Sequence, residues 1–204
     1  LDGIIGTVAS MIRVPAEYDK AIETALGGAM QNVIVEHWDA ATVAIDHLKR
    51  TGNGRVTFLP LDRLNVLPSI SAPQVSGIVG NAADLVGYDD QIYDAVQQLL
   101  GRVWIAEDLP SARRALDRHG RGPRPTVVTL TGEIVRPGGS VTGGSDRRRR
   151  DESILARERE LRALPSRLTA AEERAAKAAD RSRELGGRIE QSQVQVTENQ
   201  SMLE

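Results

Sequence analysis

The chain has 204 residues, a formal net charge of −2 from 26 basic and 28 acidic side chains, and no cysteine. This balance argues against a protein that coats nucleic acid uniformly, and the lack of cysteine excludes disulfides, thiolate metal sites and cysteine nucleophiles. No apolar run approaches the roughly 20 residues of a membrane span, and the start lacks a signal-peptide pattern. We therefore expect a cytoplasmic protein without a membrane partner and, because the chain begins with Leu1, a fragment of a longer one.

The first half predicts alternating strands and helices. The apolar run 4–14 is expected to be a strand that ends before Pro15. Residues 16–26 then carry apolar side chains at helical spacing before Gly27, which is a typical helix-ending residue. The rest of this half predicts a strand at 32–36, a helix from an N-cap at Asp39 through Leu48 to a stop at Gly52, and a strand at 55–59.

The second half predicts the same order of elements. They are a helix at 88–100 ending at Gly101, a strand at 102–106, a helix at 110–119 and a strand at 126–130. Short stretches also match between the halves: 44–46 with 115–117 and 56–59 with 127–130 at an offset of 71, and 26–27 with 100–101 at 74. We interpret these matches as an internal repeat; the alternative is chance, since this order of elements is common in α/β proteins.

The fold class expected is therefore mixed α/β, with two similar subdomains that each pack helices on a small sheet. An N-terminal subdomain at 1–64 and a C-terminal subdomain at 82–150 are joined by a connector at 65–81 that contains Pro and Ser. After the last strand, Thr131 and Gly132 can turn a hairpin into residues 133–137.

Residues 151–204 predict a coiled-coil arm. Ala, Arg and Glu dominate, and a heptad register starts at Leu161, with mostly apolar or small a and d positions. Such a helix is about 75 Å long at 1.5 Å per residue. Pro165 is expected to kink it, and Gly186 and Gly187 to weaken it by roughly 1 kcal/mol each. Its seam needs a partner, which is either another chain or sequence upstream of Leu1.

The stretch GGSVTGGS at 138–145 matches a phosphate-binding P-loop except at the lysine, where Gly144 stands. Without the lysine, about one unit of phosphate charge is uncompensated, and a helix N-terminus supplies only about half a charge. Glycines also allow two backbones to approach closely, which favours a contact with another strand or helix. A flexible joint between hairpin and arm is the remaining interpretation. A contact of this kind would involve Gly138, Gly139, Gly143 and Gly144, with Val141 as an apolar knob.

Two further groups are candidate sites. Arg147, Arg148, Arg149 and Arg150 predict contact with DNA phosphates without reading of sequence, although a solvated helix start paired with neighbouring acids is the alternative. The three histidines lie in different elements without metal-ligand spacing, and no nucleophile, base and orienting group come together. We therefore expect no enzymatic activity, no metal and no cofactor in this fragment.

The segments EYDKAIETALGGAMQNVIVE, GRVTFLPLD and GEIVRPGGSVTGGS, followed by a long heptad helix, closely resemble the hinge of structural maintenance of chromosomes (SMC) proteins of the bacterial or archaeal type. The resemblance covers residues 1–150 and the start of the returning arm. It implies a homodimer in which edge strands of two copies meet and in which the glycine-rich segment lies at the contact. It also implies distant heads that bind ATP and Mg²⁺, a kleisin subunit, and a nucleoid-associated role in chromosome condensation and segregation. The alternatives are a nucleotide-binding enzyme fragment with a degenerate P-loop and a pure DNA-binding module.

Overall fold

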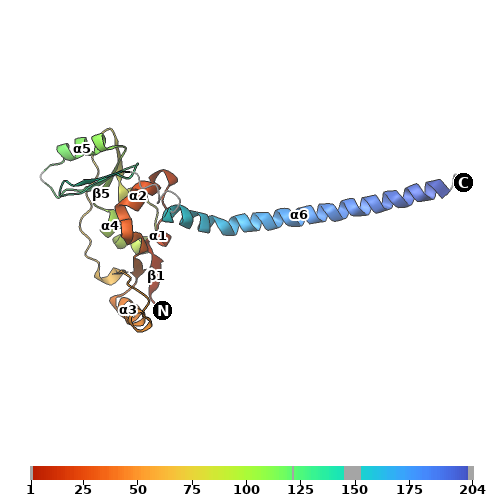
Figure 1. The fold of residues 1–204 in the computed structure, drawn as a ribbon, viewed down its shortest axis with the longest axis horizontal. Helices are drawn as coiled ribbons and strands as arrows, with labels where there is room; N and C mark the ends of the chain where they lie inside the picture. The colour runs from red at the N-terminus through yellow and green to blue at the C-terminus, as the bar shows by residue number, and fades with distance from the viewer. Residues whose placement is uncertain (1, 121, 145–152, 202–204) are drawn as a thin grey trace. The chain divides into compact units, whose positions relative to one another are not determined.

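The computed structural model describes residues 2–120, 122–144 and 153–201, and the structural statements below concern these ranges. The chain divides into two compact units, Leu1–Arg159 and Glu160–Glu204. The first unit holds all the strands, and the second is the long helical segment (Figure 1).

The first unit contains two small sheets. The first has the order β1-β2-β3, with β1 antiparallel and β3 parallel to the central strand. The second has the order β4-β5-β6-β7-β8, with β5 and β6 parallel and the other pairs antiparallel. The strands are β1 (Ile4–Thr7), β2 (Val33–Val35), β3 (Phe58–Pro60), β4 (Ile78–Asn81), β5 (Val103–Ala106), β6 (Thr126–Thr129), β7 (Ile134–Val135) and β8 (Val141–Thr142).

The helices follow local sequence signals. Gly52 ends α3 with a left-handed φ of 68°, and Asp108 begins α5 by accepting a hydrogen bond from Ser111 N at 2.8 Å. The helices are α1 (Val8–Met11), α2 (Asp19–Leu26), α3 (Trp38–Thr51), α4 (Tyr93–Leu100), α5 (Leu109–Arg118) and α6 (Ile154–Ser201). Short 3-10 turns occupy η1 (Ala16–Tyr18), η2 (Gly27–Gln31), η3 (Leu61–Arg63), η4 (Ala82–Leu85) and η5 (Asp90–Ile92).

The elements confirm the internal repeat. Strand β1, helix α1 and helix α2 have counterparts β4, η4 and α4 at a constant offset of 74, and α3 has its counterpart α5 at an offset of 71. Even a strand irregularity repeats, because the register shifts between Ile4 and Gly6 and again between Ile78 and Gly80. The predicted offset of 71 for the third strand is wrong. Ile34 pairs with Leu59 and its counterpart Ile105 pairs with Val128, so that offset is 128 − 59 = 69.

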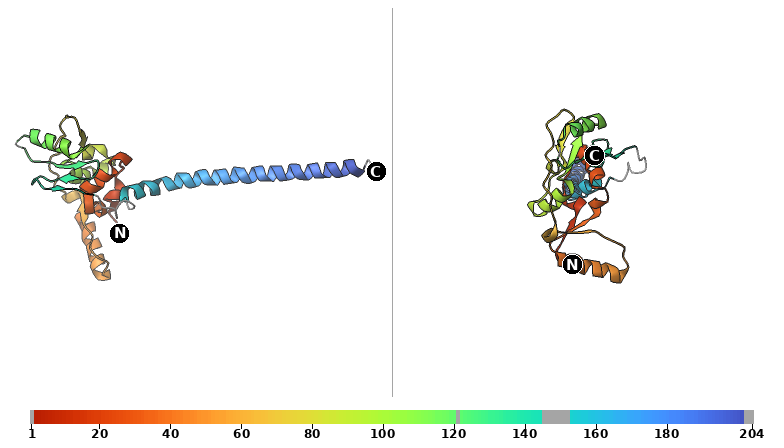
Figure 2. Two further views of the ribbon diagram at one scale, coloured as in Figure 1. Left: turned by 45° about the horizontal axis from the view of Figure 1, so that its top comes forward. Right: turned by 90° about the vertical axis from the view of Figure 1, so that its left-hand side faces the viewer.

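One hydrophobic core joins the two repeats. It contains Ile22 of α2 and Ile34 of the first sheet together with Ile105 and Val128 of the second, all nearly inaccessible to solvent. Helix α2 packs against β6 across the repeat boundary. A second cluster, on the other face of the second sheet, is covered by α5, which lies at the opposite end of this unit from α3 (Figure 2). Its buried members are Trp104, Ala106, Ala112, Ala115 and Val127.

Three expectations about elements need correction. Residues 8–11 are helical rather than part of a strand, because Thr7 caps α1 by accepting a hydrogen bond from Ser10 N. Asp39 lies inside the first turn of α3, whose N-cap is His37. The segment 65–81, expected to be only a connector, ends in β4, which is an integral strand of the second sheet.

The second unit contains the part of α6 that follows Arg159. The helix runs without interruption through Pro165, Gly186 and Gly187. Apolar side chains at the predicted a and d positions are 46–61% exposed. A seam of this size has no cover within the described arm, which agrees with the predicted need for a coiled-coil partner. These side chains are Leu161, Leu164, Leu168, Leu185, Ile189 and Val196.

Candidate functional site

The described part of the glycine-rich segment, residues 138–144, contains β8, the last strand of a hairpin with β7. Gly139 adopts a left-handed φ of 86° and donates a hydrogen bond from its N–H to Arg136 O at 2.8 Å, while Arg136 N donates to Ser140 O at 2.9 Å. This tight turn brings β8 beside β7, where Val141 lies opposite Val135. Because residues 141 and 142 are extended and paired, the segment does not form the curled loop that a P-loop needs to surround a phosphate.

Strand β8 is the outermost strand of its sheet. Since the Arg136 and Ser140 backbones are hydrogen-bonded to each other, the next opposing pair, Val135 and Val141, is a non-hydrogen-bonded one. The N–H and C=O of Val141 therefore point away from β7, toward the free edge. Its side chain is 59% exposed, so this edge offers an apolar side chain and backbone groups that have no partner among the described residues.

The glycines around Val141 differ in what they tolerate. A Cβ atom on Gly143 would lie 2.8 Å from Cγ of Glu133 in the same chain, and Gly144 has a left-handed φ of 124°. A Cβ atom on Gly138 would meet no atom within 4 Å, and its φ is not left-handed. The fold of a single chain thus accounts for glycine at 139, 143 and 144, whereas no contact within the described chain requires it at 138.

Glu133, against which Gly143 packs, is held by the turn between β6 and β7. The Thr129 hydroxyl and the Thr131 hydroxyl, the latter at 2.6 Å, both donate to its carboxylate. These bonds favour the ionised form and hold the pKa of Glu133 below its ordinary value.

The first sheet also ends in an open edge. Val33 N donates to Thr57 O at 2.9 Å, so the backbone groups of Thr57 face β2. Backbone groups alternate in direction along a strand, and those of Phe58 therefore face the free edge of β3. In the second repeat, the corresponding position beside β6 is filled by β7.

The missing strand leaves apolar side chains less covered in the first repeat. Val127 is fully buried in the second cluster. Leu116 packs against the same cluster and is partly buried, as are Val135 of β7 and residues of the connector. Their counterparts are Phe58, which is only half-buried, and Ile45, which is 38% exposed. Other exposed apolar side chains of this region are Trp38, Val43 and Val56.

A junction that the sequence analysis missed ties the start of α6 to α2. The Glu23 carboxylate accepts hydrogen bonds from Ser153 Oγ at 2.6 Å and from Leu155 N at 3.0 Å. Arg159 donates to Val14 O at 3.1 Å and forms an ion pair with Asp19, which raises the pKa of the guanidinium further. Leu155 is only 4% exposed. No short motif signals these contacts, because the partners come from distant parts of the chain.

The other predicted site residues are less informative. Arg147, Arg148, Arg149 and Arg150 lie outside the described residues. His119 contacts Pro123 O at 3.1 Å and stacks edge-on to Trp104. Within the described ranges, no three His, Asp or Glu side chains are grouped so as to hold a metal ion, and no helix has the length and apolar character of a bilayer span.

Residues 1–116 match the family model described as SMC proteins Flexible Hinge Domain. The chain is 39% identical over 181 residues to the Chromosome partition protein Smc of Bacillus subtilis (strain 168), an alignment that covers 86% of this chain and 15% of that protein. The chain thus spans only about a seventh of the length of this curated relative.

Two solved structures are also similar. One is an asymmetric dimer of the Geobacillus stearothermophilus SMC hinge domain, with a TM-score of 0.72 and 39% identity over 86% of this chain and 71% of that one. The other is the Pyrococcus furiosus Smc hinge domain with an extended coiled coil, with a TM-score of 0.61 and 32% identity over 91% and 72% of the two chains.

Proposed function

We propose, from the premise that this chain belongs to the family of flexible hinge domains of SMC proteins, that two copies of it associate through the free edges of their sheets. Family membership also agrees with the prediction that the chain is a hinge with a coiled-coil arm rather than an enzyme. The observation that carries the proposal is the edge of β8, where Val141 presents a side chain that is 59% exposed and backbone groups without a partner in the part of the chain that the structure describes.

The partner surface in this proposal is the edge of β3 on the second copy. Phe58 there has backbone groups directed outward, as Val141 does on β8, so that the two edges can form ladder hydrogen bonds. Joining the three strands of the first sheet to the five of the second gives one sheet of 3 + 5 = 8 strands. Val141 would then cover the partly exposed side chains of Phe58 and Ile45, the positions that β7 and the connector cover in the second repeat.

Twofold symmetry makes such an arrangement close on itself. If β8 of one copy meets β3 of another, the same contact forms again between the remaining two edges. Once the first contact exists, the second is effectively intramolecular and gains from a high local concentration. Two modest interfaces can therefore produce a stable ring that ties two coiled-coil arms together. The Geobacillus hinge domain, crystallised as an asymmetric dimer, supports self-association.

The wider role is proposed for the whole protein, of which the chain is a part. The name of its relatives, chromosome partition protein, supports a function in chromosome condensation and segregation at the nucleoid. We propose that ATP and Mg²⁺ are bound by distant heads and that a kleisin subunit contacts those heads, as the family resemblance implies.

DNA contact near the arm junction is a further part of the proposal. Its support is the run of four arginines, Arg147 to Arg150, between the hinge sequence and the arm. Each phosphate that they neutralise adds about −0.9 to the slope of log affinity against log salt concentration for duplex DNA. Changing all four to Ser should flatten this slope and weaken binding of unrelated duplexes equally, while leaving dimers intact. Unchanged DNA affinity would remove these residues from the proposal.

The self-association proposal is tested by sedimentation equilibrium of the 204-residue chain. Val141→Asp places a charge at the edge of β8 and should weaken the dimer at least tenfold. Val194→Asp is the matched control, because Val194 is 56% exposed on the arm and lies outside the predicted a and d positions. Equal dimerisation of the native chain and Val141→Asp would refute the placement of the contact. Saturable, Mg²⁺-dependent nucleotide binding by the chain would instead favour the P-loop alternative.

A further inference from the structure

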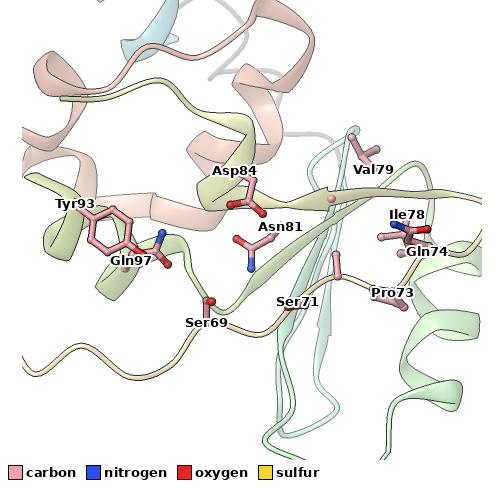
Figure 3. Close-up of a pocket in the computed structure, with 12 residues that line it drawn as sticks. Ser69, Ser71, Pro73, Gln74, Ile78, Val79, Asn81, Asp84, Tyr93 and Gln97 are labelled. Carbon is pink, nitrogen blue, oxygen red and sulfur yellow. The ribbon is translucent and has the colours of Figure 1, made fainter. Parts of the chain in front are cut away.

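A polar cavity lies between the connector, β4 and α4 (Figure 3). Its volume is about 380 Å³, near the lower end of the roughly 300–1,000 Å³ of small-molecule sites. The described residues that line it include one carboxylate, that of Asp84, and no Lys, Arg or His. The polar side chains that line it are Ser69, Ser71, Gln74, Asn81, Asp84, Tyr93 and Gln97.

Some polar groups of this cavity have partners in the protein and others do not. Asn81 is satisfied, since its amide donates to Ile70 O and Gly101 O and its Oδ1 accepts from Ala83 N. Gln97 is only 8% exposed, yet its side-chain amide forms no hydrogen bond with any described residue. The Asp84 carboxylate likewise has no hydrogen bond or ion pair within the described chain.

Gln97 is one of the residues that line the cavity. Among the described residues, no side-chain nitrogen or oxygen is fully enclosed without a partner, so the solvent-accessible part of this largely buried residue includes its amide. Buried polar groups normally have hydrogen-bond partners. The Gln97 amide has no such partner among the described residues, and a ligand bound in the cavity would supply one.

The internal repeat indicates what kind of group this helix face binds. At the offset of 74, Gln97 corresponds to Glu23 and Tyr93 to Asp19. In the first repeat, Glu23 accepts hydrogen bonds from a hydroxyl and a backbone N–H, and Asp19 pairs with the guanidinium of Arg159. The equivalent face of α2 thus binds hydrogen-bond donors, including a guanidinium, that belong to another segment of polypeptide.

We propose that the cavity beside α4 binds a guanidinium group. A guanidinium offers five N–H donors and no acceptor, which matches the Asp84 carboxylate, the Gln97 carbonyl and the serine hydroxyls as acceptors. The group is planar and stacks on aromatic rings, and Tyr93, which lines the cavity and is 51% exposed, provides such a ring. This site goes beyond self-association and does not depend on it.

Two sources can supply the same chemistry, and the probes separate them. The test is an NMR titration of the 204-residue chain that follows the side-chain amide signals of Gln97. N-acetyl-arginine amide represents an arginine within a polypeptide, and free L-arginine represents a small molecule. N-acetyl-citrulline amide has nearly the same shape without the charge. We expect the blocked arginine to shift the Gln97 signals saturably and the citrulline analogue to bind at least tenfold more weakly.

Variants make the assignment specific. Asp84→Asn should weaken binding of the blocked arginine at least tenfold, and because Asp84 is exposed and unpaired within the described chain the fold should persist. Asp94→Asn is the matched control, since Asp94 is an exposed carboxylate of α4 that does not line the cavity. Equal binding of free arginine would indicate a small molecule, and preference for the blocked form a polypeptide partner. No saturable shift, equal binding of citrulline, or an unchanged affinity in Asp84→Asn would overturn the proposal.

Discussion

Arg13 and Gly87 form two reciprocal backbone hydrogen bonds, from Arg13 N to Gly87 O at 2.6 Å and from Gly87 N to Arg13 O at 2.8 Å. Their positions differ by the repeat offset, 87 − 13 = 74, so each residue pairs with its own counterpart in the other repeat. A pair of this kind lies on a local twofold relationship between the repeats. It explains why α2 and α4, the counterpart helices, contact each other and why the two repeats share one core.

Gly138→Ala and Gly143→Ala should separate self-association from folding. An added Cβ at 138 has open space, so the free energy of unfolding should change by less than about 0.5 kcal/mol. If Gly138 lies at the contact between copies, the dissociation constant of the Gly138→Ala dimer should nevertheless rise at least fivefold. At 143 the Cβ would meet Glu133, and the melting temperature should fall. Thermal unfolding measures the stability of each variant, and sedimentation equilibrium measures its dimer dissociation constant. A Gly138→Ala dimer as tight as the native one would exclude this glycine from the interface.

Glu23→Ala should loosen the start of the arm. The change removes the acceptor for Leu155 N and Ser153 Oγ, a loss comparable to that of a helix N-cap, about 1 kcal/mol. Amide hydrogen exchange at residues 155–157 should become about fivefold faster. Glu172→Ala, on the exposed arm, is the control and should leave these amides unchanged. Native exchange rates in Glu23→Ala would show that the carboxylate does not hold the junction.

Glu133 should make the turn between β6 and β7 sensitive to acid. Its folded-state pKa is lowered, chiefly by the Thr129 hydroxyl and then by that of Thr131. A lowered pKa means that the stabilisation is present above the unfolded-state pKa of about 4.5 and is lost as pH falls through the folded-state pKa.

The check is a carboxyl NMR titration of Thr129→Val, compared with Thr131→Val. In Thr129→Val the pKa of Glu133 should rise toward its ordinary value, and the loss of stability on acidification should become smaller. A smaller rise is expected in Thr131→Val. If neither variant moves the Glu133 titration, the hydroxyls are not the cause of the lowered pKa.

Trp104→Phe should release the connector. Trp104 Nε1 donates to Ile70 O at 2.8 Å, and the side chain is 1% exposed beneath this segment. Phenylalanine cannot make this hydrogen bond and leaves space, so limited proteolysis within 65–77 should become severalfold faster. Trp38→Phe, at a tryptophan that is 57% exposed, serves as the comparison and should not change the cleavage rate. Equal cleavage of all three proteins would show that the connector is held by other contacts.

Most of the elements could be predicted from the sequence, because helix periodicity, glycine caps and short apolar strands are local signals. The helices at 16–26 and 110–119, the stop at Gly52 and the hairpin into residues 133–137 needed no tertiary information. The repeat was visible too, since its matching stretches recur at offsets of 74 and 71, and only the third strand, at 69, departs from the predicted offset. The apolar pattern at 4–14 nevertheless predicted a single strand. Helix α1 begins inside this run because the Thr7 hydroxyl caps it, and a single hydroxyl among apolar residues is too weak a signal to predict a helix start.

The open edges and the long-range contacts could not be predicted in this way. That β8 is outermost, that β3 lacks the neighbour β6 has, and that Glu23 holds the arm depend on contacts between residues far apart in the chain. The same holds for Gln97, an ordinary helical glutamine in the sequence, which becomes notable only because folding places its amide at a cavity without a partner among the described residues. Such contacts carry no periodic signal, since their energies depend on positions that the whole fold must first establish.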